Sequence, residues 1–202
     1  MKRAWLVGAV ALVLSGCTPD FLTQDESEVV LSIVKITAES AGDSSSGDNA
    51  LNSDVSPAFD DIAKVTVNAI PKNPTLSSPG SFQDVQIERY EVHYIRSDGR
   101  GVEGQDVPYS ISGNITQTIP FGGSAEIVFD VVRHQAKFEP PLLNLVGGAT
   151  QLDPSGRPVF GGGALILTCF AEITLHGRTT TGAAVQVTGR MQINFADFAK
   201  AS

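Results

Sequence analysis

Cysteine is scarce in this chain, which has only Cys17 and Cys169 among its 202 residues. Small exported domains that cannot build a sufficient core are usually held together by several disulfides, and two cysteines cannot supply such a framework. A chain of this length can bury a sizeable core in one large domain or two small ones. We therefore expect side-chain packing to stabilise the fold.

Basic residues are also few: 14 lysines and arginines stand against 22 aspartates and glutamates, which gives a formal net charge of −8. Proteins that bind nucleic acid present clustered positive charge to the phosphates. This sequence has no such cluster, and we expect no nucleic-acid partner.

Long apolar runs are absent except near the N-terminus. Lys2 and Arg3 precede an apolar stretch, residues 4–14, that is too short to cross a bilayer unaided. A short positive segment followed by an apolar stretch of this length is typical of an export signal. We interpret residues 1–16 as a signal peptide that takes no part in the fold.

The residues Leu14-Ser15-Gly16-Cys17, at the end of that stretch, resemble the lipobox of bacterial lipoproteins. The resemblance implies that the Cys17 thiol receives diacylglycerol and that cleavage before it makes Cys17 the new N-terminus. An ordinary signal peptide with an accidental cysteine is the alternative. Removal of residues 1–16 leaves 12 basic and 22 acidic residues, so the mature chain is more acidic still.

Acylation would anchor the protein to a membrane without spanning it, because each buried methylene of an acyl chain contributes about 0.8 kcal/mol. In lipoproteins an aspartate directly after the lipidated cysteine favours the inner membrane, and this chain has Thr18 there. The resemblance therefore favours the outer membrane of the cell envelope. Residues 17–28 would be the acylated tether, and residues 29–202 the folded domain.

Helical periodicity is nearly absent from the rest of the chain. Short runs rich in β-branched residues alternate with period two and are separated by clusters of Gly, Pro, Asp and Ser, which is typical of strands. Helical structure is expected at two places: a turn at residues 139–147, after Pro140 and Pro141, and a short terminal helix at residues 195–202. The expected strands lie within residues 29–39, 62–70, 84–100, 112–120, 124–137, 163–178 and 183–195.

Seven or more strands without interleaved helices predict an all-β, antiparallel β-sandwich in one domain, with a closed barrel as the alternative. In residues 84–100, Tyr90, Val92 and Tyr94 fall two apart before an Asp98-Gly99 turn. This run resembles the third strand of fibronectin type III and related immunoglobulin-like domains. The resemblance implies a sandwich of the immunoglobulin-like type.

Residues 41–61 are small, polar and acidic, and we expect a surface loop there. Aspartate and asparagine oxygens suit calcium, but the spacing that starts at Asp48 departs from a known calcium loop at Ala50 and Ser53. A solvated loop is favoured, with metal binding as the alternative. The candidate ligands are Asp43, Asp48, Asp54, Asp60 and Asp61, with Asn49 and Asn52.

Only three histidines occur, His93, His134 and His176, each on a different expected strand. Three imidazoles brought together can bind zinc, but their spacing does not indicate that they meet. Positions exposed to solvent at the rim of the domain are favoured instead. Cys169 lies in an apolar strand, where we expect it to be buried and unreactive.

Catalytic motifs are missing. Residues 42–47, GDSSSG, resemble the Gly-Asp-Ser block of one esterase family, but Ser45 stands where that family has an apolar residue. The glycine-rich residues 160–164 lack the Lys-Ser/Thr of a phosphate loop. The charged run 132–141, with Arg133, Lys137 and Glu139, is expected to be an edge strand protected against aggregation, with a docking strip as the alternative. We expect no cofactor and no enzymatic activity.

These expectations favour a membrane-anchored, non-enzymatic lipoprotein whose sandwich contacts another envelope component, a protein or a glycan. The alternative is a calcium- or zinc-dependent binding module or an enzyme on the same scaffold, because a fold does not determine function.

Overall fold

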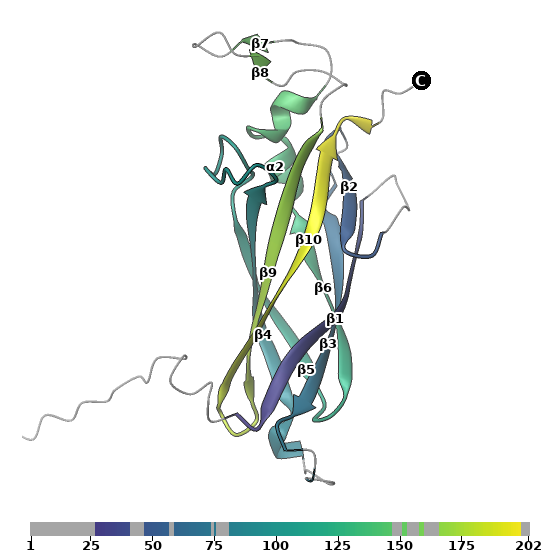
Figure 1. Ribbon diagram of the computed structural model, residues 1–202, viewed down its shortest axis with the longest axis vertical. Helices are drawn as coiled ribbons and strands as arrows, with labels where there is room; N and C mark the ends of the chain where they lie inside the picture. Colours follow the sequence, from purple (N-terminus) through teal and green to yellow (C-terminus); the bar gives the residue numbers. More distant parts are fainter. Residues whose placement is uncertain are drawn as a thin grey trace, which may run out of the picture.

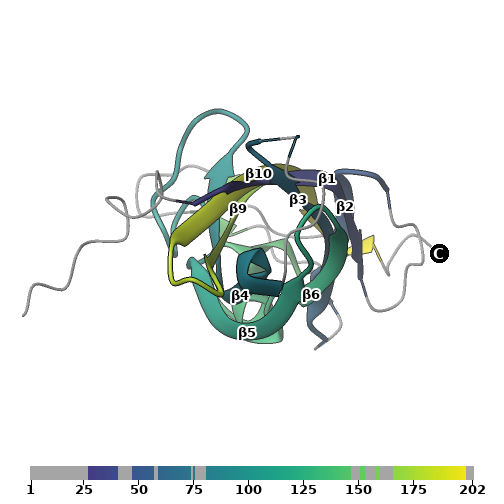
Figure 2. The ribbon, with the colours of Figure 1, turned by 90° about the horizontal axis from the view of Figure 1, so that it is seen from below.

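The computed structural model describes residues 27–40, 47–56, 59–73, 75, 81–146, 151–152, 158–159 and 166–198. Strands predominate in this part of the chain and form two main sheets around a common core. Figure 1 shows the strands from the side, and Figure 2 shows them end-on. The prediction of an all-β fold is confirmed.

One sheet has three antiparallel strands in the order β1-β3-β6, and the other has five in the order β2-β10-β9-β4-β5. All pairs in the larger sheet are antiparallel except β2 with β10, which is parallel. The strands of the smaller sheet are β1 (Val29–Glu39), β3 (Asp61–Pro71) and β6 (Ser124–Val132). Those of the larger sheet are β2 (Ala50–Asp54), β4 (Val85–Arg96), β5 (Ile111–Ile119), β9 (Leu167–Thr179) and β10 (Ala184–Ala196), and a separate pair joins β7 (Gln151–Leu152) to β8 (Pro158–Val159).

Helical segments in the described residues are short: η2 (Ser81–Gln83), α2 (His134–Lys137) and η3 (Leu142–Leu145). The last of these follows Pro141 and confirms the helical turn expected at residues 139–147. Within the described ranges, no helix has the length and apolar character needed to cross a membrane.

Alternation of side chains creates the core. Along β9, every second residue from Leu167 to Thr179 is buried, as a strand with one face on a core requires. The ring of Tyr90 on β4 stacks on Phe129 of β6 with centroids 4.5 Å apart, so an aromatic contact joins the two sheets. Tyr90, Val92 and Tyr94 are all buried, which confirms that they share one face of their strand.

Cys169 is fully buried on β9, as the sequence predicts. Burial raises the pKa of its thiol to about 12, so the nucleophilic thiolate is strongly disfavoured at neutral pH.

The expectation of one surface loop over residues 41–61 is wrong in its second half. Ala50–Asp54 form β2 in parallel with β10, and Leu51 and Val55 are buried. Asp61 is also buried, at the start of β3. A strand this short has a weak period-two signal, and its partner lies more than a hundred residues further along the chain.

The expectation of an edge strand at residues 132–141 is also wrong. β6 ends at Val132, and α2 follows directly. The Lys137 side chain, expected on the surface, is only 1% exposed because it turns inward to a buried carboxylate.

The strands define two ends of this two-sheet fold. We call the entry end the one where β1 begins at Val29, beside Pro71 at the end of β3. The turns at residues 120–123 and 180–183 lie at this end. We call the opposite end, where β3 begins and β6 ends, the far end; α2 lies there (Figure 1).

Candidate functional site

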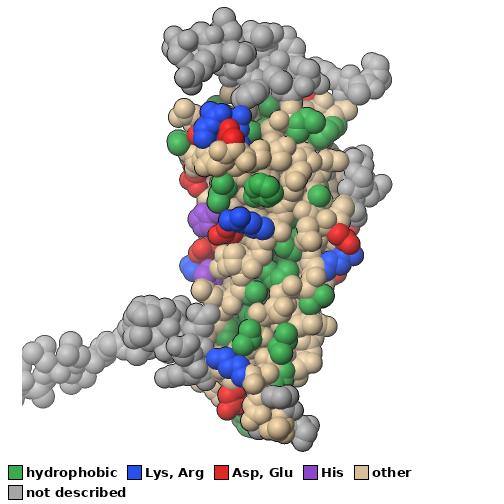
Figure 3. Space-filling view, in the orientation of Figure 1, with side chains coloured by type: hydrophobic (Ala, Val, Ile, Leu, Met, Phe, Trp, Pro, Cys, Tyr) green, Lys and Arg blue, Asp and Glu red, His purple; other side chains and the backbone are tan. Residues whose placement is uncertain are grey.

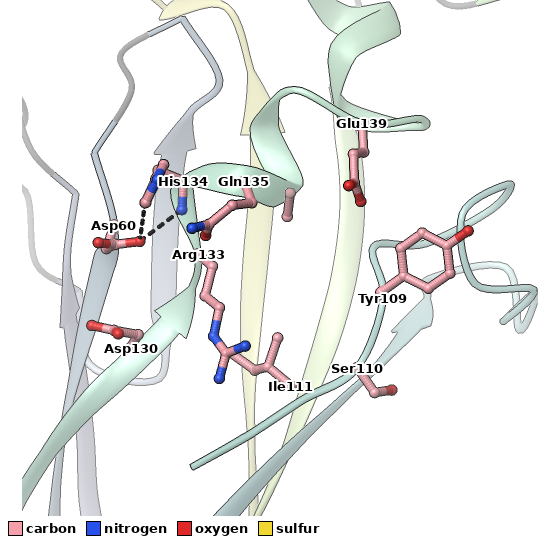
Figure 4. A pocket seen from close by; sticks show the side chains of 10 residues that line it. Asp60, Tyr109, Ser110, Ile111, Asp130, Arg133, His134, Gln135 and Glu139 are labelled. Atoms are coloured by element: carbon pink, nitrogen blue, oxygen red, sulfur yellow. Dashed lines mark hydrogen bonds and ion pairs between the residues drawn. The ribbon is translucent and has the colours of Figure 1, made fainter.

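A pocket of about 430 Å³ opens at the far end. Four separate segments build it: the residue before β3, the residues around the start of β5, the end of β6, and the stretch that contains α2. Successive strands from β3 to β6 run in opposite directions, so every second connection along this part of the chain lies at the far end, and these segments meet there. The lining residues are Asp60, Tyr109, Ser110, Ile111, Asp130, Arg133, His134, Gln135, Ala136 and Glu139 (Figure 4).

A buried ion pair fixes α2 beneath this far-end pocket. Lys137 Nζ lies 2.9 Å from Asp61 Oδ1, and the two side chains are 1% and 0% exposed. Ser40 Oγ donates to Oδ1 at 2.7 Å, and Ser53 Oγ donates to Oδ2. Burial raises the pKa of Asp61, and the Lys137 ammonium opposes that shift. Both carboxylate oxygens have donors, so this pair ties α2 to the start of β3.

Asp60 supplies the first N–H of α2 with an acceptor. The N-cap residue, Arg133, makes no side-chain cap. Asp60 Oδ1 instead accepts from the backbone N–H of His134 at 2.7 Å and lies 2.9 Å from His134 Nδ1. The backbone hydrogen bond, more than any other contact, holds the pKa of Asp60 below its usual value. A residue from another segment therefore performs the capping that the helix lacks locally.

A serine–histidine contact lies at the rim of the pocket. Ser110 Oγ is 2.9 Å from His93 Nδ1, and Ser110 also donates its hydroxyl proton to Glu103. The Ser110 hydroxyl, with the backbone N–H of Ser110, holds the pKa of Glu103 below its usual value. A serine nucleophile needs a histidine that accepts its proton. Here the carboxylate accepts it and His93 must donate, so the contact does not activate Ser110.

Two of the three histidines approach one carboxylate. His93 Nε2 and His176 Nε2 lie 3.8 Å and 3.6 Å from Glu91 Oε2, on the outer face of the five-stranded sheet. Figure 3 shows histidine side chains beside acidic ones along the edge of this face. His134 binds Asp60 in the far-end pocket instead. Among the described residues, no three His, Cys, Asp or Glu side chains are arranged to hold a metal ion.

The candidate calcium ligands take separate partners. Asp48 pairs with Lys35 at 2.9 Å, and Asp54 accepts hydrogen bonds from Ser56. Asp60 caps α2 and Asp61 binds Lys137, as described above. Asn52 accepts a hydrogen bond from Asn194 on β10. Asp43 lies outside the described residues.

Several other residues of interest lie outside the described part of the chain. They are the signal peptide, Cys17 and the tether up to residue 26, most of the GDSSSG segment, and the glycine-rich residues 160–164.

No sequence pattern indicates Tyr109, Ser110, Asp130 or Gln135 as site residues. None of them belongs to a motif, and the strand contacts that bring them together are long-range. The available signal was the length of the connections at residues 97–110 and after Val132, since long connections at one end of a rigid scaffold often carry binding residues.

Comparison with known proteins shows no family to which this chain belongs. No family model and no curated protein matches the chain. One similar solved structure is the Northeast Structural Genomics Consortium target SoR45, at 8% identity and a TM-score of 0.36 over 87% of this chain and 91% of that one. Another is the putative ApaA protein from Bordetella pertussis, at 11% identity and a TM-score of 0.38 over 82% and 94%. Likeness this distant carries no argument about fold or function.

Proposed function

We propose that this protein is a lipid-anchored, non-enzymatic lipoprotein of the bacterial envelope that binds another envelope component through its far end. Cys17 carries the lipid in this proposal, and Thr18 favours the outer membrane. The observation that carries the proposal is the position of the pocket: the chain enters the sandwich at Val29, and the pocket lies at the opposite end of the same strands.

The tether supports this geometry. Residues 17–28 reach at most about 40 Å when fully extended, at about 3.5 Å per residue. An anchor at Cys17 would therefore keep the entry end within about 40 Å of the bilayer and leave the far-end pocket at the end of the domain that is not attached. A binding site on an anchored protein is most accessible to a partner at that position.

The chemistry of the described residues supports binding over catalysis. The Ser110 hydroxyl donates a hydrogen bond to the Glu103 carboxylate, and the Cys169 thiol is buried with a raised pKa. The Lys137 ammonium is paired and has no access to solvent. These three potential nucleophiles of the described residues therefore lack either a base or access to solvent.

We also propose that the sandwich is of the immunoglobulin-like type. The strand order β1-β3-β6 opposite β10-β9-β4-β5 corresponds to the order A-B-E opposite G-F-C-C′ of such domains, with β2 as an added edge strand. The chain departs from antibody domains at the inter-sheet disulfide, because Cys169 on β9 has no cysteine opposite it on β3.

Photo-crosslinking in intact cells tests the proposed function. A photoreactive amino acid in place of Gln135 should form an adduct with an envelope component, whereas the same replacement of Thr181, in the entry-end turn, should not. Equal adducts at both positions would contradict a binding role for the far end.

The anchor is tested separately with Cys17→Ser. This variant should incorporate no radiolabelled fatty acid and should remain unprocessed. Fatty-acid labelling equal to that of the unchanged protein would remove the basis of the envelope assignment.

A further inference from the structure

The far-end pocket contains hydrogen-bonding groups that have no partner within the described residues. The carboxylates of Asp130 and Glu139 and the side-chain amide of Gln135 make no hydrogen bond or ion pair there. Arg133 donates to the Ser112 carbonyl at 2.7 Å and pairs with neither carboxylate. In Figure 4, Glu139 and Asp130 lie on opposite sides of the pocket, with the Arg133 guanidinium between them. The pocket therefore offers separated acceptors and donors to a ligand.

A ligand of a single charge does not fit this set. A cation would be satisfied by Asp130 and Glu139 but would face the guanidinium of Arg133. An anion would meet the reverse problem and the net charge of −8 on the chain. Either ligand would leave charged groups of one sign desolvated without a partner. The desolvation penalty of such a group exceeds the net stabilisation from a typical hydrogen bond.

Hydroxyl groups fit both kinds of wall group, because each donates one proton and accepts through its lone pairs. A molecule with several adjacent hydroxyls can donate to Glu139 or Asp130 and accept from Arg133 or Gln135 at once. A sugar ring has this chemistry, and a pocket of about 430 Å³ lies within the size range of small-ligand sites.

Tyr109 adds an apolar surface beside these groups. Its side chain is 53% exposed and lines the pocket near Glu139. The tip of the ring packs over Gly104, where an added Cβ would come within 2.4 Å of Tyr109 Oη. This contact holds the ring in place, and an aromatic face held in place can pack against the C–H face of a sugar.

The wall that carries Arg133, Gln135 and Glu139 is also fixed before any ligand arrives. The buried Lys137–Asp61 pair and the Asp60–His134 hydrogen bonds hold α2 on the sandwich. Groups held in position lose little conformational entropy on binding, so a modest number of hydrogen bonds gives measurable affinity.

We infer that the far-end pocket binds a neutral saccharide, through Tyr109 as a stacking surface, through the unpaired side chains of Asp130, Gln135 and Glu139, and through the guanidinium N–H groups of Arg133 that do not bind the Ser112 carbonyl. This inference rests on the proposed binding function of the far end and names its ligand class. A basic peptide segment is the competing ligand that the test distinguishes.

The experiment is ligand-observed saturation-transfer NMR on the full-length protein in detergent. The probes are neutral oligosaccharides of glucose, galactose, mannose and N-acetylglucosamine, with pentalysine as the charged competitor. At least one saccharide should show binding at ligand concentrations up to about 10 mM. Its Kd should hardly change between low and high salt, because binding neutralises no net charge.

Matched variants assign the binding to the pocket. Tyr109→Ala should weaken saccharide binding at least tenfold, and Tyr109→Phe, which keeps the ring, should change it less than threefold. Phe138→Ala removes another exposed aromatic ring that does not line the pocket and should leave the Kd unchanged.

Three outcomes would overturn the inference: no saccharide binds, pentalysine binds in its place with strong salt dependence, or Tyr109→Ala has no effect on saccharide binding. None of these results removes the proposed function, because crosslinking at Gln135 detects a partner of any chemistry. Loss of the Gln135 adduct alone would instead contradict the proposed function and leave a measured saccharide affinity standing.

Discussion

At the entry end, the chain turns from β5 to β6 within residues 120–123 and from β9 to β10 within residues 180–183. Each turn contains a glycine with positive φ, Gly122 at 70° and Gly182 at 95°. At the far end, residues 97–110 join β4 to β5, and an even longer connection separates β6 from β9. Two connections at the entry end are thus tight turns, beside the longer connection of residues 72–84, whereas long segments build the pocket at the far end.

The two ends also differ in how their polar groups are used. Within the described part of the chain, the side chains of Asp130, Gln135 and Glu139 at the far end have no partners, while the buried Lys137–Asp61 ion pair holds α2 in place. A loop that presents unpaired groups needs such support, because it lacks the ladder hydrogen bonds that hold a strand. We therefore expect the conformation of the segment that contains α2 to depend on the Lys137–Asp61 pair.

The largest effect is expected from Lys137→Ala. The change leaves the Asp61 carboxylate buried without its counter-charge, and removing one partner of a buried pair costs about 3–5 kcal/mol in the free energy of unfolding. Urea unfolding followed by circular dichroism measures this. The exposed pair Arg190–Glu172 is the matched control, and Arg190→Ala should cost less than about 1 kcal/mol.

The double variant Lys137→Ala with Asp61→Ala sharpens this prediction. It removes both charges and should be less destabilised than Lys137→Ala alone. If the single and double variants unfold at the same urea concentration, the loss comes from packing and not from the unpaired charge.

At the entry end the expected cost is smaller. Gly182→Ala introduces a side chain at φ 95° in open space, so only the backbone conformation is penalised, by about 1–2 kcal/mol. Gly101, in the far-end connection, has no positive φ and an almost open environment, and Gly101→Ala should change stability by less than about 0.5 kcal/mol. If Gly182→Ala costs as little stability as Gly101→Ala, the entry-end turn does not depend on its glycine.

The sequence predicts the parts of the fold that depend on residues close together in the chain, and it misses those that depend on contacts between distant residues. Strand β4 is foreseeable because Tyr90, Val92 and Tyr94 alternate locally, and the turn at Asp98-Gly99 uses residues suited to positive φ. Strand β2 is not foreseeable, because it exists through pairing with β10. The burial of Lys137 is equally hidden, since no local pattern indicates that its partner is Asp61.

The same limit applies to the candidate site. The sequence places His134 and Arg133 in a charged run and Asp60 in an acidic one, and nothing local relates the two. They meet because the end of β6 lies beside the start of β3. A pocket assembled from connection ends can be read only after the strand order is known.

A smaller effect is expected from changes at the cap of α2. The pKa of Asp60 is lowered, so its contribution to stability is present above the unfolded pKa, near 3.8, and is lost as pH falls through the folded value. NMR titration of the Asp60 carboxyl should therefore give a midpoint below 3.8. His134→Ala keeps the backbone N–H, which is the main cause, and should leave the midpoint low.

His134→Pro is the matched variant for that titration. Proline is tolerated at the first position of a helix but has no N–H, so the midpoint should rise above that of His134→Ala. If the two variants titrate alike, the backbone hydrogen bond is not the cause of the lowered pKa.

The smallest effect on stability is expected at the residue to which we assign ligand contact. Tyr109 is 53% exposed, so Tyr109→Ala should change the free energy of unfolding by less than about 0.5 kcal/mol. Tyr90 is the same residue type, 6% exposed and stacked on Phe129 between the sheets, and Tyr90→Ala should cost about 3 kcal/mol or more because it opens a cavity. Urea unfolding of both variants measures the contrast. A large loss at Tyr109 would mean that its ring stabilises the far-end connection, and its exposure could then no longer be taken as availability to a ligand.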